Sequence, residues 1–320
     1  MSEYANMYIA LTVEHVDEDY ITRALTELKI PKLKVPTPET EAEVYTIGQG
    51  ENILIISGFS LYDYKIVNAL TLYISSQYSS IRTLRALPAK LFTEKRLLIY
   101  PITNKYSYNR YIVKTRNYKR SIVDEDGIEV LRDLLTLRSR YTKTLHSLIK
   151  NIRPHILITV TTDKTLGIEL DEPAINMVKN KHSKIEISIP ITREIDNLKD
   201  VLQLPHTHHT YENDVSLGLL LAIPFNYSVQ DTYTVILKII EQTLKAKIEK
   251  RTLKNIEETS KIKVLSGKDE ILSTLKQHDI EIIDDSGNEI TVKYYKNNEL
   301  HTKLIEEGEI EYYFNVEILS

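Results

Sequence analysis

The sequence has no cysteine and no tryptophan, and it has only 9 glycines among its 320 residues. The absence of cysteine excludes disulfides, thiolate zinc sites and cysteine nucleophiles. The longest apolar run, Leu217 to Phe225, is too short to cross a bilayer. We therefore expect a cytoplasmic protein with no membrane partner. The scarcity of thermolabile residues beside abundant Lys and Glu is typical of a thermophilic source.

Several common catalytic signatures are also missing from the chain. It contains no Gly-x-Ser-x-Gly nucleophile elbow, no phosphate-binding loop and no dinucleotide fingerprint. These absences leave an α/β-hydrolase, a P-loop NTPase and a Rossmann dehydrogenase without support.

The formal net charge of −4 conceals an uneven distribution of charge along the chain. Residues 90–120 contain nine Lys or Arg and a single acid, whereas residues 279–320 contain eleven acids and three lysines. Such a distribution either attracts an anionic partner or lets the basic and acidic parts of one chain neutralise each other. The sequence leaves both interpretations open.

Alternating strand and helix patterns predict an α/β fold. Short continuous apolar runs indicate strands that are buried on both faces, and segments of helical period lie between them. We expect a mixed, largely parallel sheet that is covered by helices on both faces. The predicted strands are 7–13, 44–48, 52–57, 96–103, 155–163, 184–190 and 217–225, and the predicted helices are 17–28, 64–77, 128–150, 173–181 and 229–256.

The composition divides the chain into three parts. Residues 1–43 predict a strand and a helix followed by a proline-rich connector, residues 44–256 predict the α/β domain, and residues 257–320 predict a small acidic α+β appendix. In the appendix, Asp-Ser-Gly-Asn at 285–288 predicts a hairpin turn. Residues 310–319 predict a final strand.

The order of elements in residues 44–245 resembles the zinc carboxypeptidase superfamily, including its aspartoacylase and succinylglutamate desuccinylase branch. The segment "IISGFSLYDYKIVNAL" (55–70) is similar to the strand, turn and helix that carry the first two zinc ligands of that family. Residues 100–120 resemble the segment that holds the substrate carboxylate. Residues 152–163 resemble the strand that leads to the third zinc ligand, a histidine.

On this resemblance, the positions of the zinc ligands fall at Ser60, Asp63 and either Thr161 or Thr162. One aspartate and hydroxyl groups do not provide the ligands that hold a catalytic zinc. The general-base glutamate of the family would lie near residues 217–225, which contain no carboxylate. We therefore expect that zinc is lost, that no residue is catalytic, and that the chain is a pseudoenzyme with a degenerate cleft, acting in binding or assembly.

Residues 100–120 alternate tyrosines with lysines and arginines. This alternation suits a carboxylate-bearing peptide end, single-stranded nucleic acid, or a strand with one packed and one solvated face. We expect a protein or peptide partner, which includes a second copy of this chain, and nucleic acid is the alternative. By the family resemblance, the anion-binding wall would consist of Asn104, Asn109, Arg110, Arg116 and Arg120.

The histidine-rich segment "HTHHTYEND" (206–214) offers a rival site. His206, His208 and His209 are candidate ligands of a transition metal, although such a segment also occurs as an ordinary polar surface loop. If these histidines bound a metal together with Asp63, the chain would be a metal-dependent hydrolase, either a peptidase or a deacylase. That alternative requires the histidines and Asp63 to converge on one cleft.

Overall fold

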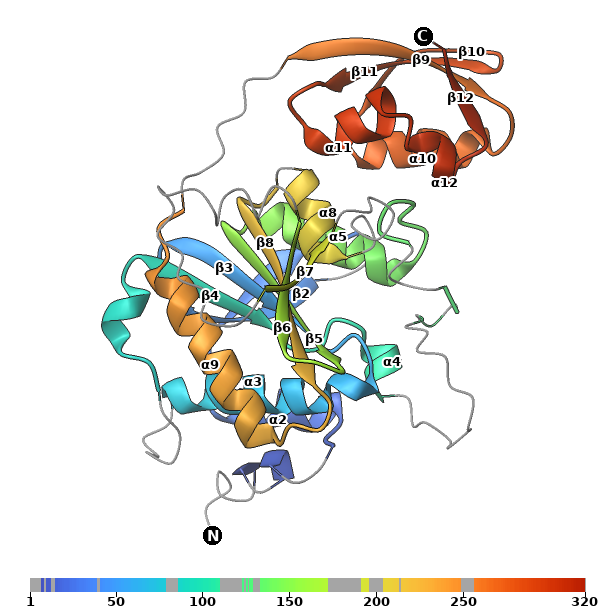
Figure 1. Ribbon diagram of the computed structural model, residues 1–320. Coiled ribbons are helices and arrows are strands. Elements are labelled where there is room, and N and C mark those ends of the chain that lie inside the picture. Colours follow the sequence, from blue (N-terminus) through green and yellow to red (C-terminus); the bar gives the residue numbers. More distant parts are fainter. Residues whose placement is uncertain are drawn as a thin grey trace.

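A large sheet covered by helices and a smaller C-terminal sheet make up the computed structural model of the protein (Figure 1). This architecture confirms the predicted α/β class with an α+β appendix. The structure describes residues 7–8, 10–12, 15–38, 41–78, 86–109, 123, 125, 127–128, 133–171, 191–195, 204–212, 214–248 and 256–319. Within these ranges, no helix combines the length and the apolar character that a membrane span requires.

Among the described residues, the large sheet has eight strands in the order β1-β2-β4-β3-β5-β8-β6-β7. Its centre is parallel, because β4, β3, β5 and β8 run in one direction, whereas β1, β2 and β6 include antiparallel pairings. The strands are β1 (Lys32–Pro36), β2 (Glu41–Gly48), β3 (Glu51–Ile56), β4 (Lys95–Tyr100), β5 (Ile156–Asp163), β6 (Gly167–Asp171), β7 (Ile191–Ile195) and β8 (Leu217–Pro224).

Helices cover both faces of this sheet. In β3, Ile53 and Ile55 belong to a core that includes α2, α3 and α9, whereas Leu54 and Ile56 belong to a second core that includes α5. Because side chains alternate between the faces of a strand, a strand covered on both sides reads as a continuous apolar run. The helices are α2 (Glu18–Glu27), α3 (Tyr64–Tyr78), α4 (Lys105–Asn109), α5 (Arg140–Ile152), α8 (Pro205–Tyr211) and α9 (Val229–Lys245).

The C-terminal sheet is antiparallel, with four strands in the order β10-β11-β9-β12. The predicted hairpin is confirmed, because Ser286 pairs with Glu289 and Gly287 turns the chain with a φ of 63°. The core beneath this sheet also contains Leu135 and Tyr211, so the sheet packs against the larger part. The elements are β9 (Glu257–Val264), α10 (Lys268–Gln277), β10 (Glu281–Ser286), β11 (Glu289–Tyr295), α11 (Glu299–His301), α12 (Ile310–Tyr313) and β12 (Val316–Leu319).

Two of the predicted elements in the N-terminal part are wrong, and the predicted last strand is right only in part. Met7, Tyr8 and residues 10–12 are helical rather than extended, and Met7 and Leu11, one helical turn apart, are buried in the same core. Part of the predicted connector forms β1, a strand at the edge of the sheet. A proline at its end is tolerated because, among the described residues, no strand forms hydrogen bonds with the outer edge of β1. The predicted last strand, 310–319, begins as α12 and only then becomes β12.

The helix predicted for 128–150 is shorter, because α5 begins at Arg140. Ser139 caps α5, accepting a hydrogen bond from the backbone N–H of Thr142 at 3.1 Å. The buried carboxylate of Asp133 accepts the N–H groups of Arg138 and Ser139 at 2.9 Å and 2.6 Å, which holds residues 133–139 in a turn. The last predicted helix also ends early, at Lys245. The predicted elements at 173–181 and 184–190 lie outside the described residues.

Candidate functional site

The turn after β3 is closed by the fully buried carboxylate of Asp63. Its Oδ2 accepts the backbone N–H groups of Phe59 at 3.0 Å and Ser60 at 3.3 Å. Its Oδ1 accepts the hydroxyl of Thr161 at 3.1 Å and the N–H of Thr162 at 2.8 Å. Asp63 therefore ties this turn to the carboxyl end of β5, and the four residues predicted as the degenerate cleft lie together.

This turn does not fit the zinc ion that the resemblance implies. Asp63 already accepts two hydrogen bonds on each carboxylate oxygen, so neither oxygen has a lone pair directed at an ion. The hydroxyl of Thr162 donates to the carbonyl of Tyr62 at 2.8 Å. A zinc ion here would have to displace the hydrogen bonds that shape the turn. The arrangement is that of a structural aspartate.

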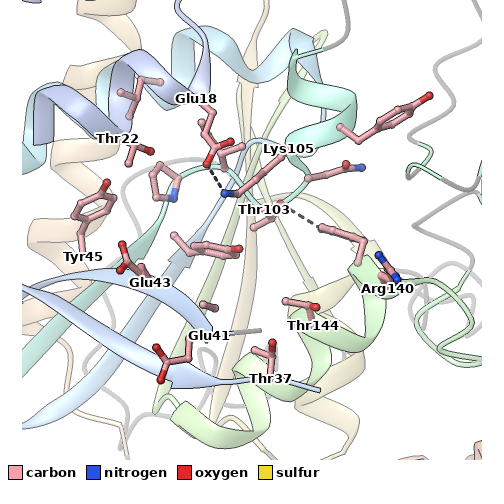
Figure 2. A pocket seen from close by; sticks show the side chains of 18 of the residues that line it. Glu18, Thr22, Thr37, Glu41, Glu43, Tyr45, Thr103, Lys105, Arg140 and Thr144 are labelled. Carbon is pink, nitrogen blue, oxygen red and sulfur yellow. Dashed lines mark hydrogen bonds and ion pairs between the residues drawn. The ribbon is translucent and has the colours of Figure 1, made fainter. Parts of the chain in front are cut away.

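A pocket of about 830 Å³ lies beside this turn, at the carboxyl end of β4 (Figure 2). The loop that forms its floor is fixed to the Asp63 turn, because the N–H groups of Thr103 and Asn104 donate to the carbonyls of Ser57 and Gly58 at 2.9 Å and 3.1 Å. The carboxyl ends of parallel strands are the usual position of ligand sites in α/β sheets. Walls come from α2, β1, β2, α4 and α5.

Charged and aromatic side chains alternate around this pocket. Figure 2 shows Glu18 and Lys105 facing each other, and they form an ion pair. Lys32 pairs with Glu43 at 2.7 Å, and Arg140 lies 3.5 Å from Glu125. The lining therefore presents acids and bases close together, with four tyrosines among them: Tyr45, Tyr100, Tyr106 and Tyr141. Burial raises the pKa of Tyr45 and of Tyr100 to about 12, so both remain neutral.

The predicted anion-binding wall is only partly described. Asn104 lines the pocket, but its amide donates to the carbonyl of Val123 at 3.1 Å and its oxygen accepts the N–H of Ser107 at 3.1 Å. The oxygen of Asn109 accepts the N–H of Glu18 at 3.3 Å. Both asparagines thus have structural roles. The three arginines of the wall, Arg110, Arg116 and Arg120, lie outside the described residues, and their role stays a prediction.

The tyrosines before residue 110 do not form a platform for stacked bases. Tyr108 is fully buried, and its hydroxyl donates to the carbonyl of Val16 at 3.0 Å. Tyr100 belongs to β4 and packs against the second core. Tyr106 is exposed. In the described half of this segment, the alternation therefore reflects a packed face and a solvated face, and nucleic-acid binding stays a prediction for the rest.

The histidine-rich segment is a helix and not the predicted polar loop. Every residue of α8 is buried. Its backbone approaches β8 so closely that a Cβ on Gly218 would lie 2.2 Å from the carbonyl oxygen of His206. Only glycine permits this contact, and the isolated glycine in a buried strand is the sequence signal that could have indicated it.

α8 brings His208 and His209 into a cluster with Glu212, which belongs to the same histidine-rich segment, and with two residues that the sequence analysis did not single out: His146 and His278. His146 comes from α5, and His278 follows α10 in the C-terminal part. Oε2 of Glu212 lies 3.7 Å from Nδ1 of His146, 3.8 Å from Nε2 of His208 and 3.5 Å from Nδ1 of His209. We call these five residues the histidine cluster.

Burial governs the charges in the histidine cluster. It lowers the pKa of His146 to about 3 and that of His209 to about 4, so both imidazoles are neutral near pH 7. Burial and the adjacent Glu212 raise the pKa of Asp214 to about 8. The two ring nitrogens of His278 lie 2.5 Å from Oε1 of Glu212 and 2.7 Å from the carbonyl oxygen of Leu135.

The histidine cluster also contains polar atoms without hydrogen bonds. Within the described part of the chain, both ring nitrogens of His146 and of His208 and Oε2 of Glu212 lack a partner. Each buried polar atom left unsatisfied costs about 1–3 kcal/mol. Five such atoms in one place therefore call for a physical explanation.

The three predicted histidines do not act together, and none of them approaches Asp63. His206 lies outside the cluster, fully buried beside Gly218. Gly218 pairs with Leu157 near the amino end of β5, whereas Asp63 binds Thr161 and Thr162 near the carboxyl end. At about 3.3 Å per residue these levels are roughly 15 Å apart. The structure therefore does not assemble a hydrolase site from the histidines and Asp63.

Comparison with known proteins gives a likeness in fold. No protein-family model and no curated protein sequence matches the chain. Among solved structures, a metallo-carboxypeptidase from Burkholderia cenocepacia is similar, with a TM-score of 0.51 and 12% sequence identity. The alignment covers 72% of this chain and 68% of the carboxypeptidase chain. A protein from Burkholderia mallei named as a carboxypeptidase has the same TM-score and identity, covering 71% of this chain and 68% of its own. The chain therefore has a carboxypeptidase-like fold.

Proposed function

We propose that this chain is a binding protein with a carboxypeptidase-like fold that does not carry out zinc peptidase chemistry at the Asp63 turn. The observation that carries the proposal is the hydrogen bonding of Asp63. A carboxylate whose two oxygens each accept two hydrogen bonds, from three backbone N–H groups and a threonine hydroxyl, is committed to the turn. The position that the family resemblance assigns to a zinc ligand therefore has a structural function.

The pocket beside this turn is the proposed ligand site. A lining of four glutamates (Glu18, Glu41, Glu43 and Glu125), three cations (Lys32, Lys105 and Arg140) and four tyrosines suits a ligand that carries both signs of charge and flat or apolar groups. A short peptide segment has these properties. The terminal carboxylate of the peptide would displace Glu125 from the guanidinium of Arg140. The side chain of Arg140 is 64% exposed, so a ligand can reach it.

The test uses short fluorescent peptides that end in a free carboxylate, the same peptides with an amidated end, and fluorescence anisotropy. We expect binding that depends on the free carboxylate, and we expect Arg140→Gln to weaken it about tenfold, the effect of one lost charge-assisted hydrogen bond. Lys263→Gln is the matched control, because Lys263 also forms an ion pair, with Glu317 at 2.8 Å, but lies in the C-terminal sheet.

Two outcomes would overturn this proposal. Cleavage of the peptides after incubation with excess zinc, lost in Asp63→Asn, would show that the turn retains peptidase chemistry. Equal binding by the wild type and Arg140→Gln, with free and amidated peptides alike, would remove the pocket as the site of carboxylate recognition.

A further inference from the structure

We propose that the histidine cluster binds one divalent transition-metal ion of the zinc class, and that this ion holds the C-terminal sheet against the large sheet. The ligands are the side chains of His146, His208 and Glu212, whose donor atoms lie within 4.8 Å of one another. This site lies near the amino ends of β5 and β8, away from the Asp63 turn, and it is independent of the peptide-binding function proposed above.

The spacing of the donor atoms is the first argument. Nitrogens of His146, His208 and His209 lie 3.7 Å, 3.8 Å and 3.5 Å from Oε2 of Glu212. These separations exceed the usual hydrogen-bond range of about 2.7–3.2 Å. They come close to the edge of a tetrahedron whose metal–ligand bonds are about 2.0–2.2 Å long, because that edge is about 3.3–3.6 Å. The donors of His146, His208 and Glu212 also lie within 4.8 Å of one another, close enough for one ion to contact all three.

The missing hydrogen bonds are the second argument. Within the described residues, His146 and His208 find no hydrogen-bond partner for either nitrogen, and Glu212 finds none for Oε2, although all three are buried. The same atoms belong to a set of possible metal-binding donors that lie within 4.8 Å of one another. Neutral imidazole nitrogens and a carboxylate oxygen are the ligands that zinc prefers. An ion would therefore satisfy Oε2 of Glu212 and one ring nitrogen of each histidine.

The surroundings of the ligands are the third argument. His278 binds Oε1 of Glu212 at 2.5 Å, which leaves Oε2 to face the histidines. The carbonyl of His278 in turn lies 2.7 Å from Nε2 of His301. Beside the ligands, Nδ1 of His209 lies 3.0 Å from Oδ2 of Asp214. Outer partners of this kind orient metal ligands in proteins.

The elements that meet here indicate a structural ion. His146 belongs to α5, His208 and His209 to α8, and His278 follows α10 of the C-terminal part (Figure 1). His208 is 0% exposed and Glu212 is 4% exposed, so a substrate could not reach an ion between them. A site closed to substrate is typical of structural zinc, whereas a catalytic zinc keeps one position open. The ion would fix α8 to α5, and Glu212 would connect it through His278 to the C-terminal sheet.

The first test titrates chelator-treated full-length protein with Zn²⁺ and with Co²⁺. We expect one ion per chain and, for Co²⁺, the intense visible absorption of a tetrahedral site with nitrogen and oxygen ligands. His208→Leu and His146→Leu should weaken binding by more than about 100-fold, and His278→Gln, which changes an orienting residue, by about 10- to 100-fold. His206→Leu is the matched control, because His206 is equally buried in α8 but lies outside the cluster.

The second measurement follows hydrogen exchange in α10 and β9 with and without zinc. We expect the ion to slow exchange at the surface where the C-terminal sheet meets α8, and we expect removal of the ion to reverse the effect. If the wild type retains no ion after incubation with excess zinc, or if His208→Leu and His206→Leu bind it equally, the metal site is wrong. The zinc titration of the wild-type protein tests whether the site binds an ion even if a variant fails to fold. Peptide binding at the pocket is unaffected by either outcome.

Discussion

The Asp63 turn and the histidine cluster lie at opposite ends of β5, and their buried carboxylates differ in how far they are hydrogen-bonded. At the turn, both oxygens of a buried carboxylate have all their hydrogen bonds. In the cluster, buried imidazoles and a carboxylate oxygen have none within the described residues. The resemblance to zinc enzymes points to the first place, whereas the physical requirements of a metal ion point to the second. The hydrogen bonding of each buried polar atom therefore indicates a metal site better than the residue types at a motif do.

The largest expected effect concerns the turn. Asp63→Ala leaves the N–H groups of Phe59, Ser60 and Thr162 without their acceptor in a buried place, and each such loss costs about 1–3 kcal/mol. We expect the free energy of unfolding to fall by about 3–5 kcal/mol in urea denaturation.

Thr161→Val is the control for this experiment, because it removes only the hydroxyl that donates to Asp63, and we expect a loss of about 1 kcal/mol. A loss below 1 kcal/mol for Asp63→Ala would contradict the structural role of the carboxylate and would reopen the turn as a functional site.

The second prediction concerns the histidine cluster, where stability should depend on zinc rather than on hydrogen bonds within the protein. Zinc at about 100 times its dissociation constant should raise the free energy of unfolding of the wild type by about 2.7 kcal/mol. His208→Leu should abolish this increase. In the absence of zinc, the same variant should be as stable as the wild type, or up to about 2 kcal/mol more stable, because it removes two ring nitrogens that have no partner.

A crossed experiment sharpens this result. Asp63→Ala should lose stability but keep the zinc-dependent increase, whereas His208→Leu should do the opposite. If His208→Leu is strongly destabilised without zinc, the histidine has a packing or hydrogen-bonding role that replaces the proposed one.

The sheet could be predicted from the sequence because its central strands are continuous apolar runs. Ile53 to Ile56 is one such run, and burial of alternating residues on both faces is what the interior strand of a helix-covered sheet requires. The hairpin at Gly287 could be predicted because two-residue turns require residues that tolerate a positive φ. Local chemistry determines both of these features.

The histidine cluster could not be predicted in the same way. α8 is only seven residues long and rich in His and Thr, so it has neither apolar periodicity nor strong helix propensity. Its burial depends on the contact with Gly218, and its partners His146 and His278 are far away in sequence. His146 does follow the apolar face of α5, next to Leu145 and Ile149, which is a weak signal of burial. Only the tertiary fold brings these histidines together.

The smallest expected effect concerns an ion pair near the cluster. Lys150 of α5 pairs with Asp279 of the C-terminal part at 2.7 Å, and the carboxylate is 72% exposed. Exposed pairs contribute about 0–1 kcal/mol, because water screens the charges and the side chains lose freedom. Lys150→Met keeps most of the aliphatic contact, so we expect a loss of about 0.5 kcal/mol in the zinc-loaded protein, measured by urea denaturation.

A larger loss in zinc-free protein than in zinc-loaded protein would indicate that the ion pair and the ion hold the same surface together. Equal losses would show that the two act independently, and then the hydrogen bond between His278 and Glu212 is the main connection from the cluster to the C-terminal sheet.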